Sequence, residues 1–469
     1  MVAAGPGTAR AADEAAIQTA AQASRAAPVG RGQLQPLTPG VFDTGLWPEV
    51  DDLRDNLEAE GWLLQGQFTY IQQGHPRFRS PYQGENSLTN GKKTRETMSF
   101  GPLIGRQLWD GAALYFNPEF TQGFGLNSAT GTAGFPNGEA FRAGTTEPRL
   151  NYSRLFVRQV FGFGGAQETI ERDQLQFHDT VDVHRLTVTA GKLSVFDLFD
   201  DNRYSHDPRT QFMNWALMDA GAVDFAADAK GFTLGVAVDY NREDWAARAG
   251  VFQVAKSPNA KPLDDHVLEG WQLLTELEQR FSLGDRPGRI RELAMVDRTR
   301  AIRYGGFPGL APVQADDPLP GFRRYRMSYG FALNLEQELT DELGLFSRLS
   351  WNPGDVQEFM FTEIDRSASL GLSLAGVAWG RPHDTVGLAG VVNALSDAHR
   401  RYYAAGNIGF IIGDGRLNYA TEQILESYYV FRIHKGVELT VDYQLINNPA
   451  YNADRGPVSI FAVRFHVEY

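Results

Sequence analysis

The chain has 469 residues, a formal net charge of −13 and no cysteine. The charge argues against nucleic acid as a partner, and the lack of cysteine excludes disulfides and thiolate metal sites. The mean hydropathy is −0.32 and no apolar run reaches the length of a membrane helix, which excludes a helical membrane protein. The 49 glycines and 12% aromatic residues suit instead a barrel with one apolar and one polar face.

The first segment, residues 1–40, is rich in Ala, Gly and Pro and shows almost no periodicity. Ala9-Arg10-Ala11 fits the small-x-small pattern of a signal-peptidase site, which predicts that Met1 lies inside a longer signal peptide. A disordered N-terminal tail explains the same residues.

The second segment, residues 41–61, is predicted to be periplasmic and to contain one short helix, from Pro48 to Glu60. Pro48 suits the first helical turn, the apolar residues that follow share one face, and Gly61 can end the helix.

From Trp62 onward, alternating apolar and polar residues replace helical patterns. The clearest runs are 232–240, 327–335, 437–445 and 458–469. A period of two places the apolar residues on one face of a strand. About ten residues rise roughly 33 Å, which spans the hydrocarbon layer when the strand is tilted. In the first run, the apolar set from Phe232 to Tyr240 is therefore expected to face lipid.

The final run alternates up to Tyr469, with Phe461 and Val463 on its apolar face. A terminal strand is protected when it pairs with the first strand of a closed barrel. The aromatic end resembles the signal that outer-membrane barrels present to their assembly machinery. The alternation alone also fits a soluble sandwich.

The lengths of the connections favour the barrel. Long and short connections alternate along the chain, with tight turns expected at Gly105 to Gln107, Asn241 to Asp244 and His434 to Gly436. The stretch 164–183 is an exception, because it should be a short turn but is long and polar. The pattern predicts an all-β fold, a transmembrane antiparallel β-barrel of about sixteen strands over residues 62–469.

Aromatic residues near the predicted strand ends are expected to form girdles at the membrane–water interface. They are Trp62, Tyr115, Phe161, Trp245, Trp271, Trp351, Trp379 and Tyr469.

Two predicted outer loops, 117–151 and 196–230, are much longer than the others. In and beside them lie the strings YFNPEFTQGFG (115–125), AGFPNGEAFR (133–142) and HDPRTQFMNWALMD (206–219). These strings resemble those of the carbohydrate-selective porins, the OprB-like family. RLFVRQ (154–159), LTVTAGK (186–192) and the final strand also agree, and the likeness runs from about residue 60 to the end.

The resemblance implies a sixteen-stranded barrel in the outer membrane of a Gram-negative bacterium, in contact with outer-membrane lipid. It implies facilitated diffusion of glucose and similar monosaccharides, without energy coupling, by a monomer or a trimer.

Sugar recognition needs planar polar groups for ring hydroxyls and aromatic faces for the apolar side of the ring. The two long loops offer Asn137, Glu139, Arg142, Asp207, Arg209, Asn214 and Trp215. Structural roles compete with this reading. Asn137 precedes Gly138 in a common turn pair, Asp207 precedes a proline and can start a turn, and Arg209 can pair with Asp207 to brace the loop.

Arg154 and Arg158 alternate with Leu155 and Val157, so both arginines should face the lumen. There they can line the constriction and donate to sugar hydroxyls in a planar fork. They can equally balance lumen carboxylates such as Glu119.

No nucleophile elbow and no phosphate-binding loop is present, and the nine histidines are scattered. We therefore expect no enzyme, no cofactor and no metal site, with calcium at Asp200-Asp201 as the minor alternative. The nearest functional alternative is a general or anion-preferring porin for small polar solutes, which lumen arginines would favour. A barrel enzyme and a soluble sugar-binding β-sandwich are the rivals from other classes.

Overall fold

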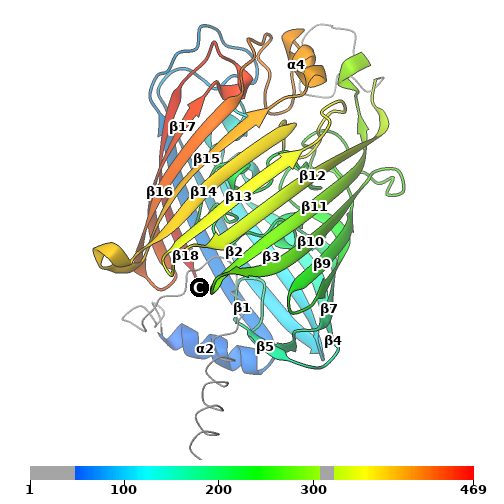
Figure 1. The fold of residues 1–469 in the computed structure, drawn as a ribbon, viewed down its shortest axis with the longest axis vertical. Helices are drawn as coiled ribbons and strands as arrows, with labels where there is room; N and C mark the ends of the chain where they lie inside the picture. The colour runs from blue at the N-terminus through cyan, green and yellow to red at the C-terminus, as the bar shows by residue number, and fades with distance from the viewer. Residues whose placement is uncertain (1–47, 307–321) are drawn as a thin grey trace, which may run out of the picture.

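The computed structural model describes residues 48–306 and 322–469, and within them sixteen strands form one closed antiparallel barrel (Figure 1). The barrel strands are β1 (Trp62–His75), β2 (Lys93–Trp109), β3 (Ala112–Gly123), β4 (Thr145–Gly162), β7 (Arg185–Leu193), β8 (Thr233–Asn241), β9 (Trp245–Phe252), β10 (Trp271–Leu283), β11 (Arg286–Ala301), β12 (Arg324–Glu338), β13 (Leu343–Trp351), β14 (Arg366–Gly376), β15 (Arg381–Ala394), β16 (Glu422–His434), β17 (Val437–Asn447) and β18 (Val458–Glu468). The predicted leader, residues 1–40, lies outside the described residues.

The barrel closes where its first and last strands meet. β1 and β18 pair antiparallel, from Gln67 opposite Glu468 to Gly74 opposite Phe461. The backbone groups of Gly66 and Tyr469 exchange two hydrogen bonds of 2.7 Å beyond that register. This pairing gives hydrogen-bond partners to the backbone N–H and C=O groups of the terminal strand, as the sequence predicted.

Alternation along each strand separates an outer apolar face from a polar lumen. In β18, the side chain of Phe461 is 56% exposed on the outer surface, whereas Arg464 is 0% exposed inside. Two aromatic residues depart from the prediction. Tyr115 is 2% exposed and faces the lumen, because it shares its parity with Asn117 and Glu119 on β3. Phe232 is also buried, because it ends an inward-folded loop and precedes the first residue of β8.

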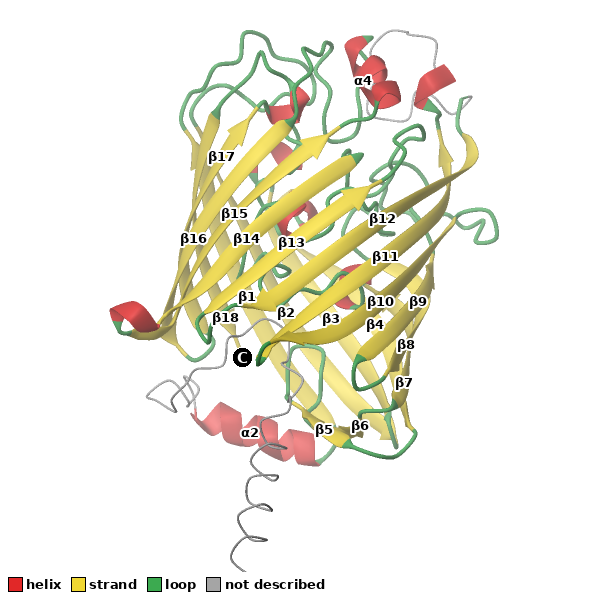
Figure 2. Cartoon of the chain, viewed as in Figure 1, coloured by secondary structure: helices red, strands yellow, loops and turns green. Residues whose placement is uncertain are grey.

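Short turns lie at the end of the barrel that carries the C-terminus, and long loops lie at the other end (Figure 2). The predicted turn at Gly105 to Gln107 is wrong, since β2 continues to Trp109 and the turn is Asp110-Gly111. Gly105 lies inside β2, where its lack of a side chain allows Leu63 and Phe177 to pack closely against it. A Cβ atom on it would lie 2.8 Å from the Cβ of Leu63 and 3.0 Å from the ring of Phe177.

The predicted loop 117–151 is also too long, because β3 reaches Gly123 and β4 begins at Thr145. Pro118 does not end β3; it lies at a register shift between the two strands, where a missing N–H is tolerated. The loop is therefore 124–144, and Glu119 belongs to the barrel wall. The second long loop is 194–232, close to its predicted bounds.

The long polar connection 163–184 contains a hairpin of β5 (Gln167–Ile170) and β6 (Asp179–Asp182), which lies beside α2 (Pro48–Ala59) at the short-turn end. Arg172 joins the two elements, with Nη1 2.7 Å from Asp55 and 2.9 Å from Glu58. The backbone N–H of Gly164 and then the amide of Gln167 hold the pKa of Asp182 below its usual range.

The other helices lie in the long loops or turns. They are α3 (Trp215–Met218), α4 (Asp397–Ala404) and the 3-10 turns η1 (Leu126–Ala129), η2 (Ala140–Arg142), η3 (Val195–Asp197), η4 (Tyr304–Gly306), η5 (Val377–Trp379) and η6 (Pro449–Tyr451). Within the described residues, none of the helices has both the length and the apolar character to cross a bilayer.

Candidate functional site

Loop 194–232, which joins β7 to β8, folds into the barrel. Side chains on distant wall strands hold its backbone. Arg348 of β13 donates to the carbonyl oxygen of Leu217 at 3.0 Å, and Arg464 of β18 donates to that of Pro208 at 2.7 Å. Contacts with strands on separate parts of the wall require the loop to cross the lumen, so this loop narrows the channel.

Two carboxylates of β16 hold both long loops. Glu426 accepts from the backbone N–H of Asn214 at 3.0 Å, and Glu422 accepts from that of Gly134 at 2.7 Å. Buried backbone N–H groups need acceptors, and these two side chains supply them to the inward-folded loops. Loop 124–144 is thereby fixed against the same wall as loop 194–232.

The two loops also pack on each other around Trp215. The Trp215 backbone N–H donates to the carbonyl of Phe135 at 3.0 Å, and the two rings stack with centroids 5.0 Å apart. Trp215 is 0% exposed, and its ring also contacts those of Phe196 and Phe361. In this conformation, the tryptophan predicted to stack on sugar forms the core between the two loops.

The two asparagines predicted to contact sugar are also buried, and their side chains form hydrogen bonds within the protein. Asn214 donates to Oε1 of Gln444 at 3.0 Å and caps α3 by accepting from the N–H of Ala216 at 3.1 Å. Asn137 accepts from the N–H of Glu139 at 3.0 Å. The side chain of Arg142, the third polar candidate of this loop, lies outside the described part of the structure.

Four of the predicted charged residues meet in one buried cluster beneath the loops. Nη2 of Arg209 lies 3.0 Å from Glu139 and 3.3 Å from Glu119. Arg154 lies 3.8 Å from Glu119 and makes a two-pronged contact with Asp197, at 2.7 and 2.8 Å. The two arginines and three carboxylates therefore join β3, β4 and both loops.

Asp207 accepts from the backbone N–H of Arg209 at 2.8 Å, which closes a turn in loop 194–232. Asp200, half of the minor calcium alternative, lies 3.1 Å from Arg348 and accepts from the N–H of Ala220 at 2.7 Å. The carboxylate of Asp200 therefore already forms an ion pair with Arg348, in place of the calcium ion of the minor alternative.

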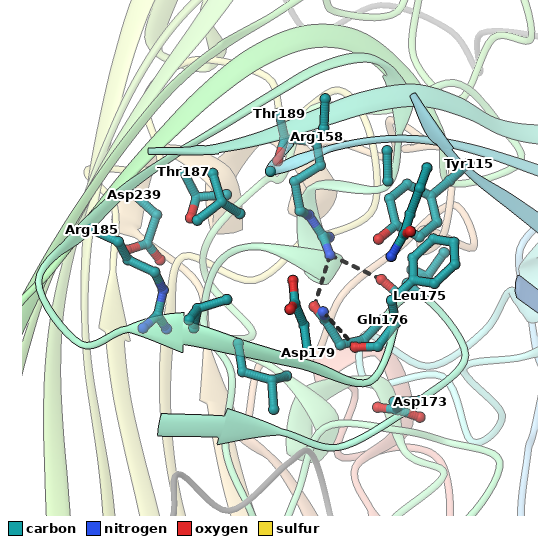
Figure 3. A pocket seen from close by; sticks show the side chains of 18 of the residues that line it. Tyr115, Arg158, Asp173, Leu175, Gln176, Asp179, Arg185, Thr187, Thr189 and Asp239 are labelled. Atoms are coloured by element: carbon teal, nitrogen blue, oxygen red, sulfur yellow. Dashed lines mark hydrogen bonds between the residues drawn. The ribbon is translucent and has the colours of Figure 1, made fainter. Parts of the chain in front are cut away.

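Below loop 194–232, a cavity of about 770 Å³ lies on the lumen side of β3, β4, β7 and β8, and segment 163–184 lines its other side. We call this cavity the inner vestibule. Arg158 projects into it and donates to the carbonyl of Leu175 at 2.9 Å and to Oε1 of Gln176 at 3.1 Å (Figure 3). Its guanidinium also lies 5.2 Å from the ring centre of Tyr115.

Among the candidate residues whose side chains the structure describes, Arg158 is the one that lines the vestibule. Its charged lining comprises eight carboxylates and four arginines: Glu60, Asp110, Glu171, Asp173, Asp179, Asp197, Asp201, Asp239, Arg106, Arg158, Arg185 and Arg248. Sequence reasoning did not single out Asp239 or Arg185 as pore residues. The signal was present for Asp239, because it stands on the polar face of the alternating run 232–240.

A closed sixteen-stranded barrel with an apolar outer face, a polar lumen and an inward-folded loop defines a channel of the outer membrane. The chain belongs to the carbohydrate-selective porin, OprB, family, whose model matches residues 85–469. It is therefore a transport channel of the outer membrane and not an enzyme.

One solved structure shows the same fold, and two others are more weakly similar. The high-pH structure of Pseudomonas putida OprB aligns with a TM-score of 0.68 and 15% identity, over 92% of this chain and 100% of that chain. The low-pH structure of the same protein aligns with a TM-score of 0.48 and 11% identity, over 94% and 100%. The outer-membrane channel DcaP of Acinetobacter baumannii aligns with a TM-score of 0.49 and 10% identity, over 87% of this chain and 98% of that chain. The comparison with curated proteins finds no match.

Proposed function

We propose that this porin passes glucose and other monosaccharides by facilitated diffusion. The observation that carries the proposal is the inner vestibule, which offers arginine donors and carboxylate acceptors inside a barrel of the carbohydrate-selective family. Sugar hydroxyls donate and accept hydrogen bonds, so a lining of both kinds can replace the water that a sugar loses on entry.

Arg158 is the proposed sugar contact. Its guanidinium is only partly buried and lies on the vestibule wall, and Tyr115 lies beside it. A planar guanidinium can donate to two neighbouring hydroxyls of a pyranose ring.

The other candidates are proposed to fix the shape of the constriction. Glu119, Arg154 and Arg209, with Glu139, hold the loops through buried ion pairs. Asp207, Asn137, Asn214 and Trp215 hold turns and the interface between the two loops. Arg142 stays a predicted sugar contact.

The chain organisation is also a proposal. We propose a signal-peptide remnant and/or a disordered N-terminal segment in 1–40, a periplasmic segment in 41–61 and a barrel domain in 62–469, with the C-terminal strand presented to the barrel assembly machinery. Sedimentation of the detergent-solubilised protein distinguishes the predicted monomer from the predicted trimer.

The anion-preferring alternative is disfavoured by the charges of the vestibule. Among its described residues, the lining has eight carboxylates and four arginines, and two of the carboxylates, Asp197 and Asp201, also pair with Arg154 and Arg291 behind it. The carboxylates that remain in excess attract cations. A reversal potential in a salt gradient should therefore indicate cation preference, and an anion-selective reversal potential would favour the alternative.

Single-channel recording in a planar bilayer tests the proposal. The purified protein should give stable open steps, and added glucose should reduce the current in a saturable way because the sugar occupies the vestibule. Open steps that do not respond to glucose would indicate a general porin.

A further inference from the structure

Three side chains with metal-binding donors meet in the long loops at the end of the barrel where α4 lies (Figure 1). Glu358 and Asp365 belong to loop 352–365, between β13 and β14, and His399 lies in α4. One donor atom of each lies within 4.8 Å of the other two, and all three residues are buried. The group is separate from the vestibule.

Two atoms of this group are buried without a partner. Among the described residues, neither Oε2 of Glu358 nor Nε2 of His399 has a hydrogen-bond partner. The other carboxylate oxygen of Glu358 accepts from Nδ2 of Asn352 at 2.9 Å. Buried polar atoms in proteins are nearly always hydrogen-bonded or coordinated, so an unpartnered carboxylate oxygen beside a second carboxylate indicates a cation ligand.

The charges around Glu358 also favour a cation. In the part of the chain that the structure describes, no lysine or arginine forms an ion pair with Glu358 or Asp365; His399 is the basic group beside Asp365. A divalent ion would supply the missing positive charge.

The imidazole is held in a fixed orientation. The rings of Tyr304 and Tyr403 stack on His399, with centroids 4.1 and 4.8 Å away. Nδ1 of His399 lies 3.0 Å from Oδ1 of Asp365. This hydrogen bond orients the ring and leaves its second nitrogen, Nε2, as the donor atom without a partner in the described part of the chain.

We propose that Glu358, Asp365 and His399 bind one divalent transition-metal ion, with Zn²⁺ preferred over Ca²⁺. One imidazole and two carboxylates suit zinc, whereas calcium takes six to eight oxygen ligands. The ion would tie loop 352–365 to α4 and would stabilise the outer loops. The assignment does not depend on which solute the channel passes.

The experiment uses the untagged full chain in detergent, stripped with EDTA and titrated separately with ZnCl₂ and CaCl₂ by calorimetry. We expect one zinc ion per chain, retained on gel filtration and counted by mass spectrometry. Glu358→Gln keeps the acceptor for Asn352 but removes the charged ligand. Its zinc affinity should fall at least about 100-fold, because loss of an outer-shell partner alone costs about 10–100-fold. His399→Gln should have a similar effect. Asp265→Asn, in the exposed group Asp264-Asp265-His266, is the matched control and should bind zinc as the wild type does.

Folding of each variant is checked by its heat-modifiable electrophoretic mobility. Zinc should raise the melting temperature of the wild type but not that of Glu358→Gln. Absence of stoichiometric zinc in the wild type, preference for calcium, or a zinc affinity in both ligand variants equal to that of the wild type would overturn the assignment. Loss of binding in Asp265→Asn alone would place the metal in the other group and would also overturn it.

Discussion

Arg158 is where a single side chain bears most directly on transport. We expect Arg158→Ala to raise the glucose concentration for half-block about tenfold, because a hydrogen bond to a charged group contributes roughly 1.5–3 kcal/mol. The measurement is glucose titration of single-channel current. Arg149→Ala is the control, since Arg149 is exposed near the other end of the same strand. Equal block in wild type and Arg158→Ala would remove Arg158 from the sugar site.

Arg209 tests the buried charge cluster. Arg209→Ala would leave Glu139 buried without its arginine and Glu119 with only the longer contact to Arg154, so we expect the free energy of unfolding to fall by about 3–5 kcal/mol. Thermal unfolding of the detergent-solubilised protein measures the loss. Lys256→Ala breaks an exposed pair with Asp265 and should leave the melting temperature unchanged. Similar melting temperatures for both variants would contradict the account.

For single residues, the sequence predicts which face of a strand a side chain lies on better than it predicts which residues that side chain contacts. Alternation correctly placed Arg154 and Arg158 in the lumen, because a period of two follows from strand geometry. It could not show that Trp215 is enclosed by Phe135, Phe196 and Phe361, since that burial depends on the packing of distant chain segments.

The inward loop 194–232 is the element on which the shape of the channel depends. A Cβ atom on Gly221 would lie 3.4 Å from the Cβ of Ser367 on β14, close to the separation of about 3.5–4.5 Å in a disulfide. The natural chain has no cysteine, so the double variant Gly221→Cys, Ser367→Cys should form one defined crosslink.

We expect this crosslink to form under mild oxidation and to leave the open conductance unchanged, because the loop already lies against the wall. Single-channel recording before and after reduction measures this, with Gly221→Cys alone as the control. Failure to form the crosslink, or a conductance that falls on oxidation, would show that loop 194–232 does not normally lie against β14.

Element boundaries show where local signals mislead. Gly105 was placed in a predicted turn and Pro118 in a predicted loop, yet both lie inside strands. The ring of Phe177 packs against Gly105, and Pro118 lies at a register shift. The hairpin within 163–184 was not predicted, since its short strands of four residues carry little periodicity.

At the scale of the whole molecule, the outer face must stay apolar. We expect Val463→Arg, on the lipid face of β18, to destabilise the folded barrel by about 2–4 kcal/mol, as a charge near the bilayer midplane does. Urea titration of folding into lipid vesicles measures the change. Leu268→Arg is the control, because Leu268 is exposed in a loop outside the barrel wall, and an equal loss there would contradict the proposed lipid face.

The global architecture was the most predictable feature. A barrel that closes in a bilayer requires long and short connections to alternate and its last strand to pair with the first. The closed sixteen-stranded barrel confirms the architecture predicted from these two features. The vestibule was not predictable, because its described lining combines residues of six barrel strands with segment 163–184 and loop 194–232.

The central claim is that the channel passes neutral sugars. Its most direct test is the initial rate of solute entry into proteoliposomes, with glucose compared against gluconate, an anion of similar size. The account predicts faster entry of glucose, because the carboxylates of the vestibule repel an anion. Gluconate entry as fast as glucose entry, or glucose entry no faster than in protein-free liposomes, would contradict it.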